Sequence, residues 1–169
     1  MFRKMRRFKQ ELDQETCIEI LNRGTHGVLA LHGDDGYPYA VPLSYHYEDG
    51  AIFFHCAKTG HKIDAIVRDP TASFCVVDQD LVVPEKYTTF YRSVIAFGRI
   101  SKIEDEAEKW AAVEKVAIKY NPNDTPENRE HEIRIDFPPL CMLRMDIDHL
   151  TGKESKYLVQ QRKAAEAEK

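Results

Sequence analysis

The sequence predicts a mainly β protein, in which antiparallel strands close into a small barrel and helices lie at its rim. Two observations lead to this fold class. Most strand-like segments follow one another directly and are joined by short turns, which favours antiparallel pairing. In addition, residues 37–47 alternate with a period of two, which is typical of a strand.

The composition bounds the class of protein. The 169 residues suit one domain, with no internal repeat and no linker to divide it. Hydrophobic residues make up 43% and charged residues 31%, as in ordinary soluble proteins. The net charge of −4 does not indicate nucleic acid. No apolar run approaches the roughly 18–20 residues of a membrane span. We therefore expect neither nucleic acid nor a membrane as a partner.

The two ends of the chain are polar. Residues 1–12 form a basic arm, with five cations between Arg3 and Lys9 and no apolar segment of a secretory signal after them. A solvated arm is the simplest interpretation, and contact with an anionic surface or a dimer partner is the alternative. Residues 160–169 form a polar tail, as a frayed helix or disordered chain. Residues 13–159 are then the folded domain.

The cysteines and histidines indicate no metal site. Cys17, Cys56, Cys75 and Cys141 form no CxxC pair and lie beside apolar residues, as free buried thiols do. Such scattered cysteines favour a reducing compartment, so we expect a cytoplasmic protein. The seven histidines show no metal-ligand spacing.

The first elements are a helix and a strand. Asp13 caps a helix that runs to about Arg23, where Gly24 ends it. Residues 26–31 read as a strand, and residues 33–36 form a turn.

The strand over residues 37–47 contains Pro38 and Pro42. Because proline cannot donate to a sheet ladder, part of this strand must lie at an edge or a bulge, where free backbone groups can contact a ligand. A turn at residues 48–50 leads into a second strand, residues 51–56, which completes a hairpin.

The middle of the chain continues with short elements. Thr59 and Gly60 open a helix that ends before Pro70. Residues 71–77 form a strand and residues 79–86 a loop. Residues 87–103 form one long strand or two joined strands, with Gly98 at a bend.

The last part of the chain combines two helices and a strand. Asp105 and Glu108 start a helix in the manner of a capping box. Residues 127–136 form a short polar helix, and residues 140–147 form the last strand. The apolar face of the first of these helices is expected at Ala107, Trp110, Val113, Ala117 and Tyr120.

The strand over residues 51–56 is apolar on both faces apart from His55, so both faces are expected to be covered. The barrel covers one face. A partner subunit is the simplest cover for the other, and a rim helix is the alternative.

Common motifs of catalysis are absent from the sequence. We find no GxGxxG after a strand, no GxxxxGK[ST], no HExxH and no GxSxG. The chemistry must therefore come from less regular clusters of residues.

The densest cluster lies at a strand-to-helix junction. A helix start leaves backbone N–H groups unpaired and attracts anions, and glycine lets the backbone come close to a ligand. Cations around this point suit a phosphate monoester, although solvated lysines are the simpler interpretation. The cluster consists of His55, Cys56, Ala57, Lys58, Gly60, His61 and Lys62.

Two further clusters lie on strands. Tyr91 and Ser93 share one face of a strand, and Arg92 points to the other. An arginine between apolar residues needs a carboxylate or a phosphate. The third cluster lies on the proline-interrupted strand, where a flat aromatic ligand could take backbone hydrogen bonds; packing of the tyrosines is the alternative. It consists of Pro42, Leu43, Ser44 and Tyr45.

Several short motifs in the same order resemble those of Nim-type nitroimidazole-resistance proteins, a branch of the pyridoxamine-phosphate-oxidase-like proteins. The resemblance covers nearly the whole chain. It rests on the strings RGTHGVLA at 23–30, DGYPYAVPLSY at 35–45, His55 with GHK at 60–62, YRSV at 91–94 with Phe97 and Gly98, and TGKE at 151–154.

The resemblance implies a six-stranded antiparallel split β-barrel that binds FMN and works as a homodimer, with flavin at the subunit interface. It implies that residues 42–45 line the isoalloxazine ring and that residues 58–62 hold the phosphate. Residues 91–93 complete the site, with Lys153 in the last motif. His55 is the expected catalytic side chain. Because His61 stands at a position that is arginine or histidine in such proteins, Lys62 carries more of the phosphate contact.

The resemblance also implies an FMN-dependent oxidoreductase that reduces small electron-poor aromatics such as nitroimidazoles. A flavin- or haem-binding protein without turnover is the alternative, with His46, His55 or His61 as an axial ligand. The substrate-phosphate arginines and lysines of true pyridoxamine-phosphate oxidases form no recognisable pattern here. We therefore do not expect vitamin B6 oxidation.

Overall fold

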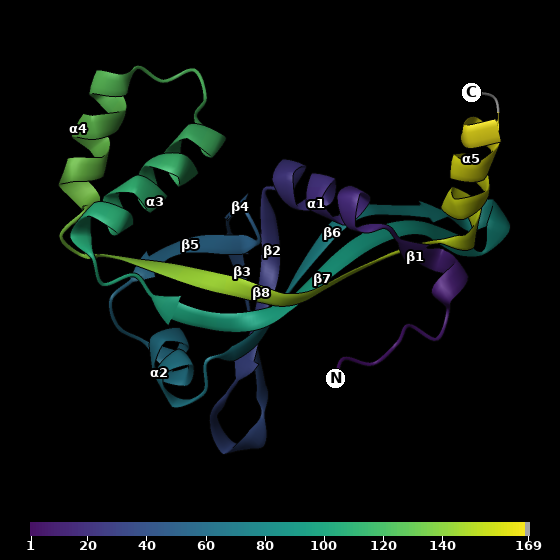
Figure 1. Ribbon diagram of the computed structural model, residues 1–169, viewed down its shortest axis with the longest axis horizontal. Coiled ribbons are helices and arrows are strands. Elements are labelled where there is room, and N and C mark those ends of the chain that lie inside the picture. Colours follow the sequence, from purple (N-terminus) through teal and green to yellow (C-terminus); the bar gives the residue numbers. More distant parts are fainter. Residues whose placement is uncertain (168–169) are drawn as a thin grey trace.

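The computed structural model describes residues 1–167 and consists of one curved antiparallel sheet with helices around it (Figure 1). The strands are β1 (Glu11–Leu12), β2 (His26–His32), β3 (Pro38–Ser44), β4 (His46–Glu48), β5 (Ala51–Ala57), β6 (Thr71–Val83), β7 (Thr88–Lys102) and β8 (Leu140–Glu154). The helices are α1 (Gln14–Arg23), α2 (His61–Arg68), α3 (Glu106–Tyr120), α4 (Pro126–Asp136) and α5 (Lys156–Ala167). Among these described helices, none has the length and apolar character to cross a membrane.

The strand order confirms the predicted mainly β, antiparallel class. It runs β3-β2-β6-β7-β8-β5-β4, and β1 pairs with β8 beside this path. The described residues thus form eight strands, where six were expected. The two counts differ because Tyr45 divides one predicted strand into β3 and β4, and because the two-residue β1 was not predicted.

The sheet curls into a split barrel but is not closed by hydrogen bonds. Its two edges, β3 and β4, are joined through Tyr45. The Tyr45 N–H donates to the Tyr120 hydroxyl over 2.8 Å, and that hydroxyl lies 3.0 Å from the Tyr45 carbonyl. A side chain from the end of α3 therefore replaces the sheet ladder at this point, and the strand is interrupted.

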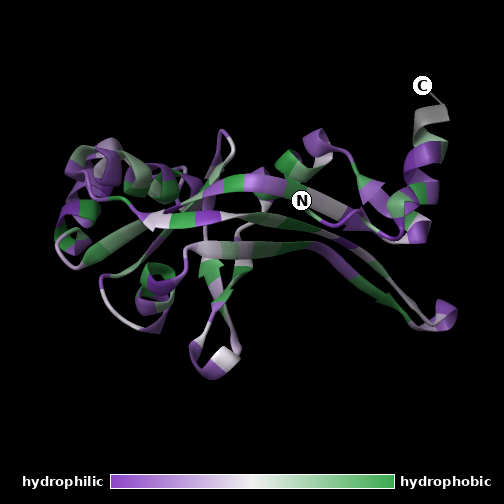
Figure 2. Cartoon of the chain, turned by 60° about the horizontal axis from the view of Figure 1, so that its bottom comes forward, coloured by the Kyte–Doolittle hydropathy of each residue, from purple (hydrophilic) through white to green (hydrophobic). Residues whose placement is uncertain are grey.

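Strands β6 and β7 form a long hairpin, so the loop predicted over residues 79–86 is wrong. Strand β6 continues to Val83, and only residues 84–86 form a 3-10 turn. The register shifts between Val77 and Gln79, and this bulge hides the alternation of the following residues. Figure 2 shows the hairpin projecting from the body of the molecule.

Strand β7 is a single strand with a register shift between Phe97 and Gly98, as the predicted bend requires. A Cβ on Gly98 would lie 1.9 Å from the Asp146 carbonyl oxygen, so the close approach of the strands depends on glycine. Strand β8 extends to Glu154, well past the predicted end at residue 147.

The core lies inside the curved sheet. Phe74 on β6 makes edge-on ring contacts with Tyr45 and Phe54, with centroids 4.9 Å and 5.0 Å away. Ala51 and Phe53, on the other face of β5, pack against Ala112 and Val116 of α3. The rim helix, not a partner subunit, therefore covers this face.

The buried face of α3 also differs from the expected one. Lys109, Ala112 and Val116 are buried, whereas the predicted Ala107 is exposed; Trp110, Val113 and Ala117 are half-buried, and Tyr120 is 40% exposed. The long stem of Lys109 explains the shift, since its ammonium lies 4.0 Å from the centre of the Phe137 ring while the stem stays inside.

Both ends of the described chain pack against the sheet. Residues 8–10 form a 3-10 turn, and Glu11 pairs with Lys153 of β8. The arm is thus anchored to the fold at Phe2 and at residues 10–12, while its five cations remain exposed to solvent, in line with the simplest interpretation. Residues 160–167 belong to α5, in line with the helical alternative for the tail, and residues 168–169 lie outside the described residues.

Candidate functional site

The first cluster lies where β5 ends and α2 begins. Gly60 adopts φ = +119°, a conformation that favours glycine, and its Cβ position faces open space. The backbone N–H groups of His61 and Lys62 are the first of α2, and the first N–H groups of a helix have no acceptor within it. The turn therefore presents unpaired N–H groups to solvent, at the positive end of the helix dipole.

The cations at this turn differ in their availability. The His61 imidazole stacks on Tyr39, with ring centroids 4.1 Å apart, and its Nε2 lies 3.3 Å from Asp34 Oδ2. His61 is thus directed toward the β2–β3 loop, a contact that no local sequence pattern indicates. Lys58 and Lys62 have no ion-pair partner among the described residues, so their charges are available to an anion.

His55 is exposed on β5, in register with Met142 of β8. Partial desolvation of the ring lowers the pKa of His55 below its usual value, and the nearby Lys62 ammonium lowers it further. The imidazole is therefore neutral at pH 7, and it can both donate and accept a hydrogen bond.

The neighbouring residues of β5 have other roles. Cys56 pairs in register with Cys141, and Ala57 with Leu140. Burial raises the pKa of the Cys56 thiol to about 11, so the thiolate is scarce at neutral pH. Cys141, Lys58 and Lys102 line an adjacent hollow of about 260 Å³.

The proline-containing strand is an edge, as predicted. Among the described strands, β3 pairs with β2 alone, with Pro42 opposite Val28 and Ser44 opposite His26. Pro42 and Ser44 are exposed, and Leu43 packs against the core. Tyr45 is fully buried, and its hydroxyl donates to the Leu21 carbonyl over 2.8 Å, so its side chain belongs to the core.

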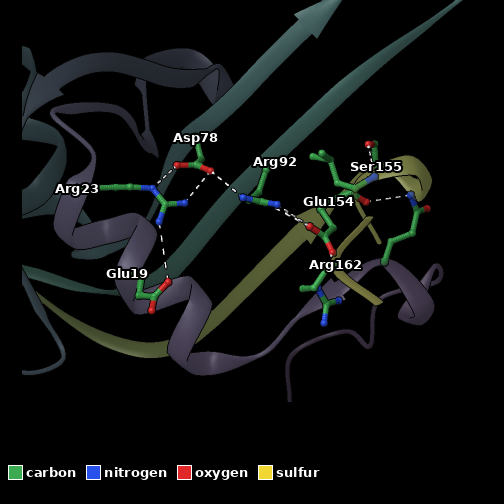
Figure 3. A network of polar contacts seen from close by, with 9 residues as sticks. Glu19, Arg23, Asp78, Arg92, Glu154, Ser155 and Arg162 are labelled. Atoms are coloured by element: carbon green, nitrogen blue, oxygen red, sulfur yellow. Dashed lines mark hydrogen bonds and ion pairs between the residues drawn. The ribbon is translucent and has the colours of Figure 1, made fainter. Parts of the chain in front are cut away.

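Arg92 lies at the other end of the molecule, in the polar network of Figure 3. Its Nη2 is 3.0 Å from Oε2 of Glu154, a carboxylate with no exposed surface. Arg162 binds the other oxygen of Glu154 over 3.0 Å. Of the two partners expected for Arg92, a carboxylate or a phosphate, the structure thus provides the carboxylate.

The network extends to a third strand. Arg92 Nη1 lies 3.6 Å from Asp78 on β6, and Arg23 at the end of α1 makes two bonds of 2.7 Å and 2.8 Å to the same carboxylate (Figure 3). Asp78 and Glu154 were not among the residues predicted for the site. Glu154 is the last residue of the TGKE motif, and the need of Arg92 for a carboxylate was the signal for its role.

The other residues of this cluster lie outside the network. Tyr91, Ser93 and Lys153 are half-buried, and Ser93 pairs in register with Lys153. The Lys153 ammonium lies 5.5 Å from the centre of the Tyr91 ring. These three residues form a polar, partly exposed patch at the end of β7 and β8.

One chain does not bring the two clusters together. On β8, Leu143 pairs with Phe54 beside His55, while Lys153 pairs with Ser93. Lys153 is ten residue steps beyond Leu143, which corresponds to roughly 30 Å of strand. His55 and Lys62 therefore lie at one end of the sheet, and Tyr91 and Lys153 lie at the other.

The sheet order, the two edges joined through Tyr45 and the peripheral helices define a split-barrel protein. Residues 13–154 match the family model described as pyridoxamine 5'-phosphate oxidase. This match covers well over half of the chain, and the protein belongs to that family. The family resemblance predicted from the motifs is confirmed.

Several solved structures share this fold. A candidate 5-nitroimidazole antibiotic resistance protein from Bacteroides thetaiotaomicron has a TM-score of 0.73 at 20% identity, over 85% of this chain and 86% of that one. An FAD-binding protein from Mesorhizobium loti has a TM-score of 0.60 at 22% identity, over 87% and 98%. An FAD- and heme-binding protein from Mycobacterium smegmatis has a TM-score of 0.70 at 21% identity, over 88% and 74%. No curated protein sequence matches the chain significantly.

Proposed function

We propose that this protein is a cytoplasmic, homodimeric FMN-binding oxidoreductase that reduces small electron-poor aromatics such as nitroimidazoles. The observation that supports a site shared between two subunits is the separation of the two clusters along β8. A two-fold axis brings one end of each subunit beside the other end of its partner. Each of the two sites would then combine His55 and Lys62 of one subunit with Tyr91 and Lys153 of the other.

The chain's own residues fit a flavin mononucleotide. The open amides after Gly60, together with Lys58 and Lys62, suit a single phosphate monoester. The exposed edge of β3 at Pro42 and Ser44 offers a flat surface and free backbone groups for the ring. The backbone of Cys56 and Ala57 would lie between these two contacts.

Residues of the second cluster would complete the site from the partner subunit. Tyr91, Ser93 and Lys153 are partly exposed and available for contact. Arg92 would act indirectly, because its guanidinium is held by Glu154 and Asp78 and fixes the strand that carries its neighbours.

Bound FMN would supply the redox chemistry, and the protein would orient the flavin and tune its surroundings. His55 is the candidate catalytic residue. Its neutral ring can donate a hydrogen bond to a reducible group, or accept a proton from one, near neutral pH. His55→Ala in flavin-loaded protein is expected to keep the fold and to lower turnover of a nitroimidazole with chemically reduced flavin.

Mixed dimers test the shared site. Lys62→Ala and Lys153→Ala remove one cation from each half, so each homodimer is expected to retain little FMN at a free flavin concentration below its weakened affinity. Co-expression of the two variants with different tags gives a heterodimer with one intact site. Its flavin content, read from the visible spectrum after tandem purification, should return to about one per dimer. A heterodimer as empty as its parents would show that each site lies within one subunit.

A binding protein without turnover is the second candidate function. One fold neighbour binds FAD and heme, and His46 Nε2 is buried without a hydrogen-bond partner among the described residues. His46 is therefore a candidate axial ligand, as is the exposed His55, while His61 is held by Asp34. The absorption spectrum of the purified protein separates the two functions, since a haem band that His46→Ala abolishes would favour this candidate.

A further inference from the structure

The N-terminal arm and α5 enclose a groove of about 620 Å³ that the candidate flavin site does not use. Five cations line it, and Phe8 lies among them. The cations are Arg6, Arg7, Lys9, Lys156 and Lys163. The groove brings together the basic arm and the polar tail of the sequence, neither of which has a role in the proposed oxidoreductase.

The arm is held in place by its own contacts. Phe2 stacks on His149, with ring centroids 4.5 Å apart. At the other end, Gln10 is buried and its Nε2 donates to the Glu154 carbonyl over 2.9 Å, next to the β1–β8 pairing. The intervening cations are thus brought close to α5 before any ligand binds, which lowers the entropy cost of binding.

The charge of the groove has no counterpart within the described chain. None of its five cations has an ion-pair partner among the described residues, although the nearby Arg92 and Arg162 are both paired with Glu154. Like charges that converge on a concave surface repel one another and raise the local concentration of anions. Five unpaired cations in one groove contrast with the net charge of −4 of the whole protein. The groove therefore fits a ligand with several negative charges.

The apolar part of the groove narrows the ligand class. Phe8 is 67% exposed beside the cations, and buried Val159 of α5 lies at the groove wall. An exposed aromatic ring offers a stacking surface for a flat base. The volume lies within the range of about 300–1,000 Å³ that small-molecule sites occupy.

We propose that this groove binds a nucleoside polyphosphate. Arg6, Arg7 and Lys163 would hold the phosphates, and Phe8 would stack on the base. A monophosphate would satisfy fewer of the five charges, so the site is distinct in its chemistry from the flavin phosphate turn. The proposal does not depend on the flavin or on turnover.

The test is calorimetric titration of the protein as purified with ATP, tripolyphosphate and adenosine. ATP should bind more tightly than tripolyphosphate, and adenosine should not bind detectably. Affinity for ATP should fall as sodium chloride is raised. Arg7→Ala and Lys163→Ala should each weaken ATP binding about tenfold, and Phe8→Ala should bring ATP down to the level of tripolyphosphate. Arg134→Ala, which removes an exposed charge on α4, is the matched control and should leave the affinity for ATP unchanged.

Unfolding by urea, monitored for every variant, shows whether a lost affinity reflects a lost fold. Protection of the amides of residues 6–10 from hydrogen exchange by ATP, in the unaltered protein, gives a readout that needs no variant. Equal binding of ATP and tripolyphosphate would overturn the role of Phe8 and the ligand class. Sedimentation with phosphatidylserine vesicles, lost in Arg7→Ala, with no binding of ATP, would assign the groove to a membrane surface instead.

Discussion

The two ends of strand β8 carry cations in opposite situations. At one end, Lys58 and Lys62 surround the start of α2 without ion-pair partners in the described chain. At the other end, Arg92 and Arg162 both bind Glu154, and Arg92 also approaches Asp78. The first arrangement leaves charge available for a ligand, while the second uses its charge to join strands and helices. The difference separates ion-paired cations, which stabilise the fold, from unpaired cations, which are available for binding.

Of the substitutions considered, Glu154→Gln should have the largest effect, and it should lower the free energy of unfolding. Glu154 has no exposed surface and balances two arginines, so its loss leaves Arg92 and Arg162 without their shared partner. We expect the free energy of unfolding to fall by about 3 kcal/mol, as measured by urea denaturation.

Glu130→Gln is the control for this change. It breaks an exposed pair with Arg134 one turn away on α4, and should cost about 0.3–0.5 kcal/mol. Equal losses for the two variants would contradict the structural role assigned to the network.

Lys62→Ala and Arg92→Ala should affect different quantities, because Lys62 is proposed to bind FMN and Arg92 to stabilise the fold. Lys62→Ala should weaken FMN binding about tenfold, equivalent to about 1.4 kcal/mol, and leave unfolding almost unchanged. Arg92→Ala should lower the free energy of unfolding because it leaves Glu154 without one of its two cations. Fluorescence titration with FMN and urea unfolding measure both quantities. A larger loss of flavin affinity for Arg92→Ala, with full stability, would assign its guanidinium to the ligand.

The smallest effect concerns the pH dependence of stability. The pKa of His46 and that of His55 are lowered in the folded state, chiefly by desolvation. Below the unfolded value of about 6.5, the unfolded chain therefore binds more protons than the folded one. Stability should be highest above this pH and fall as the pH is lowered from 7.5 to 5.5.

Lys62→Ala should raise the pKa of His55, because it removes a nearby positive charge. Titration of the imidazole resonances by NMR measures this shift. An unchanged His55 pKa would show that the two side chains do not interact across the turn.

Much of the fold follows from local patterns. Period-two alternation placed β3, Pro42 marked it as an edge, and Asp13 and Asp105 cap the helices that they were expected to start. Long-range contacts were not predictable in this way. The break at Tyr45 depends on the Tyr120 hydroxyl, which lies 75 residues away in the chain.

The candidate site shows the same division. The motifs placed Gly60 and Lys62 at a helix start, since that arrangement is local. The contacts of His61 with Asp34 and of Arg92 with Glu154 could not be predicted, because they depend on the sheet register, which no short pattern contains. The separation of the two clusters likewise emerged only when β8 proved to be fifteen residues long.

The junction at Tyr45 has a consequence for motion. There the two edges of the barrel are joined by the bonds of one hydroxyl. By contrast, β5 pairs with β8 along all of its residues, and β2 pairs with β6 over residues 28–30. Rotation of the Tyr120 side chain about its Cα–Cβ bond would move the hydroxyl away from Tyr45 and release the chain at this seam at the cost of few hydrogen bonds. Because β3 pairs with β2 over residues 38–44, the two strands would then move together as one hairpin, and this edge of the barrel would open while β5 stays paired with β8.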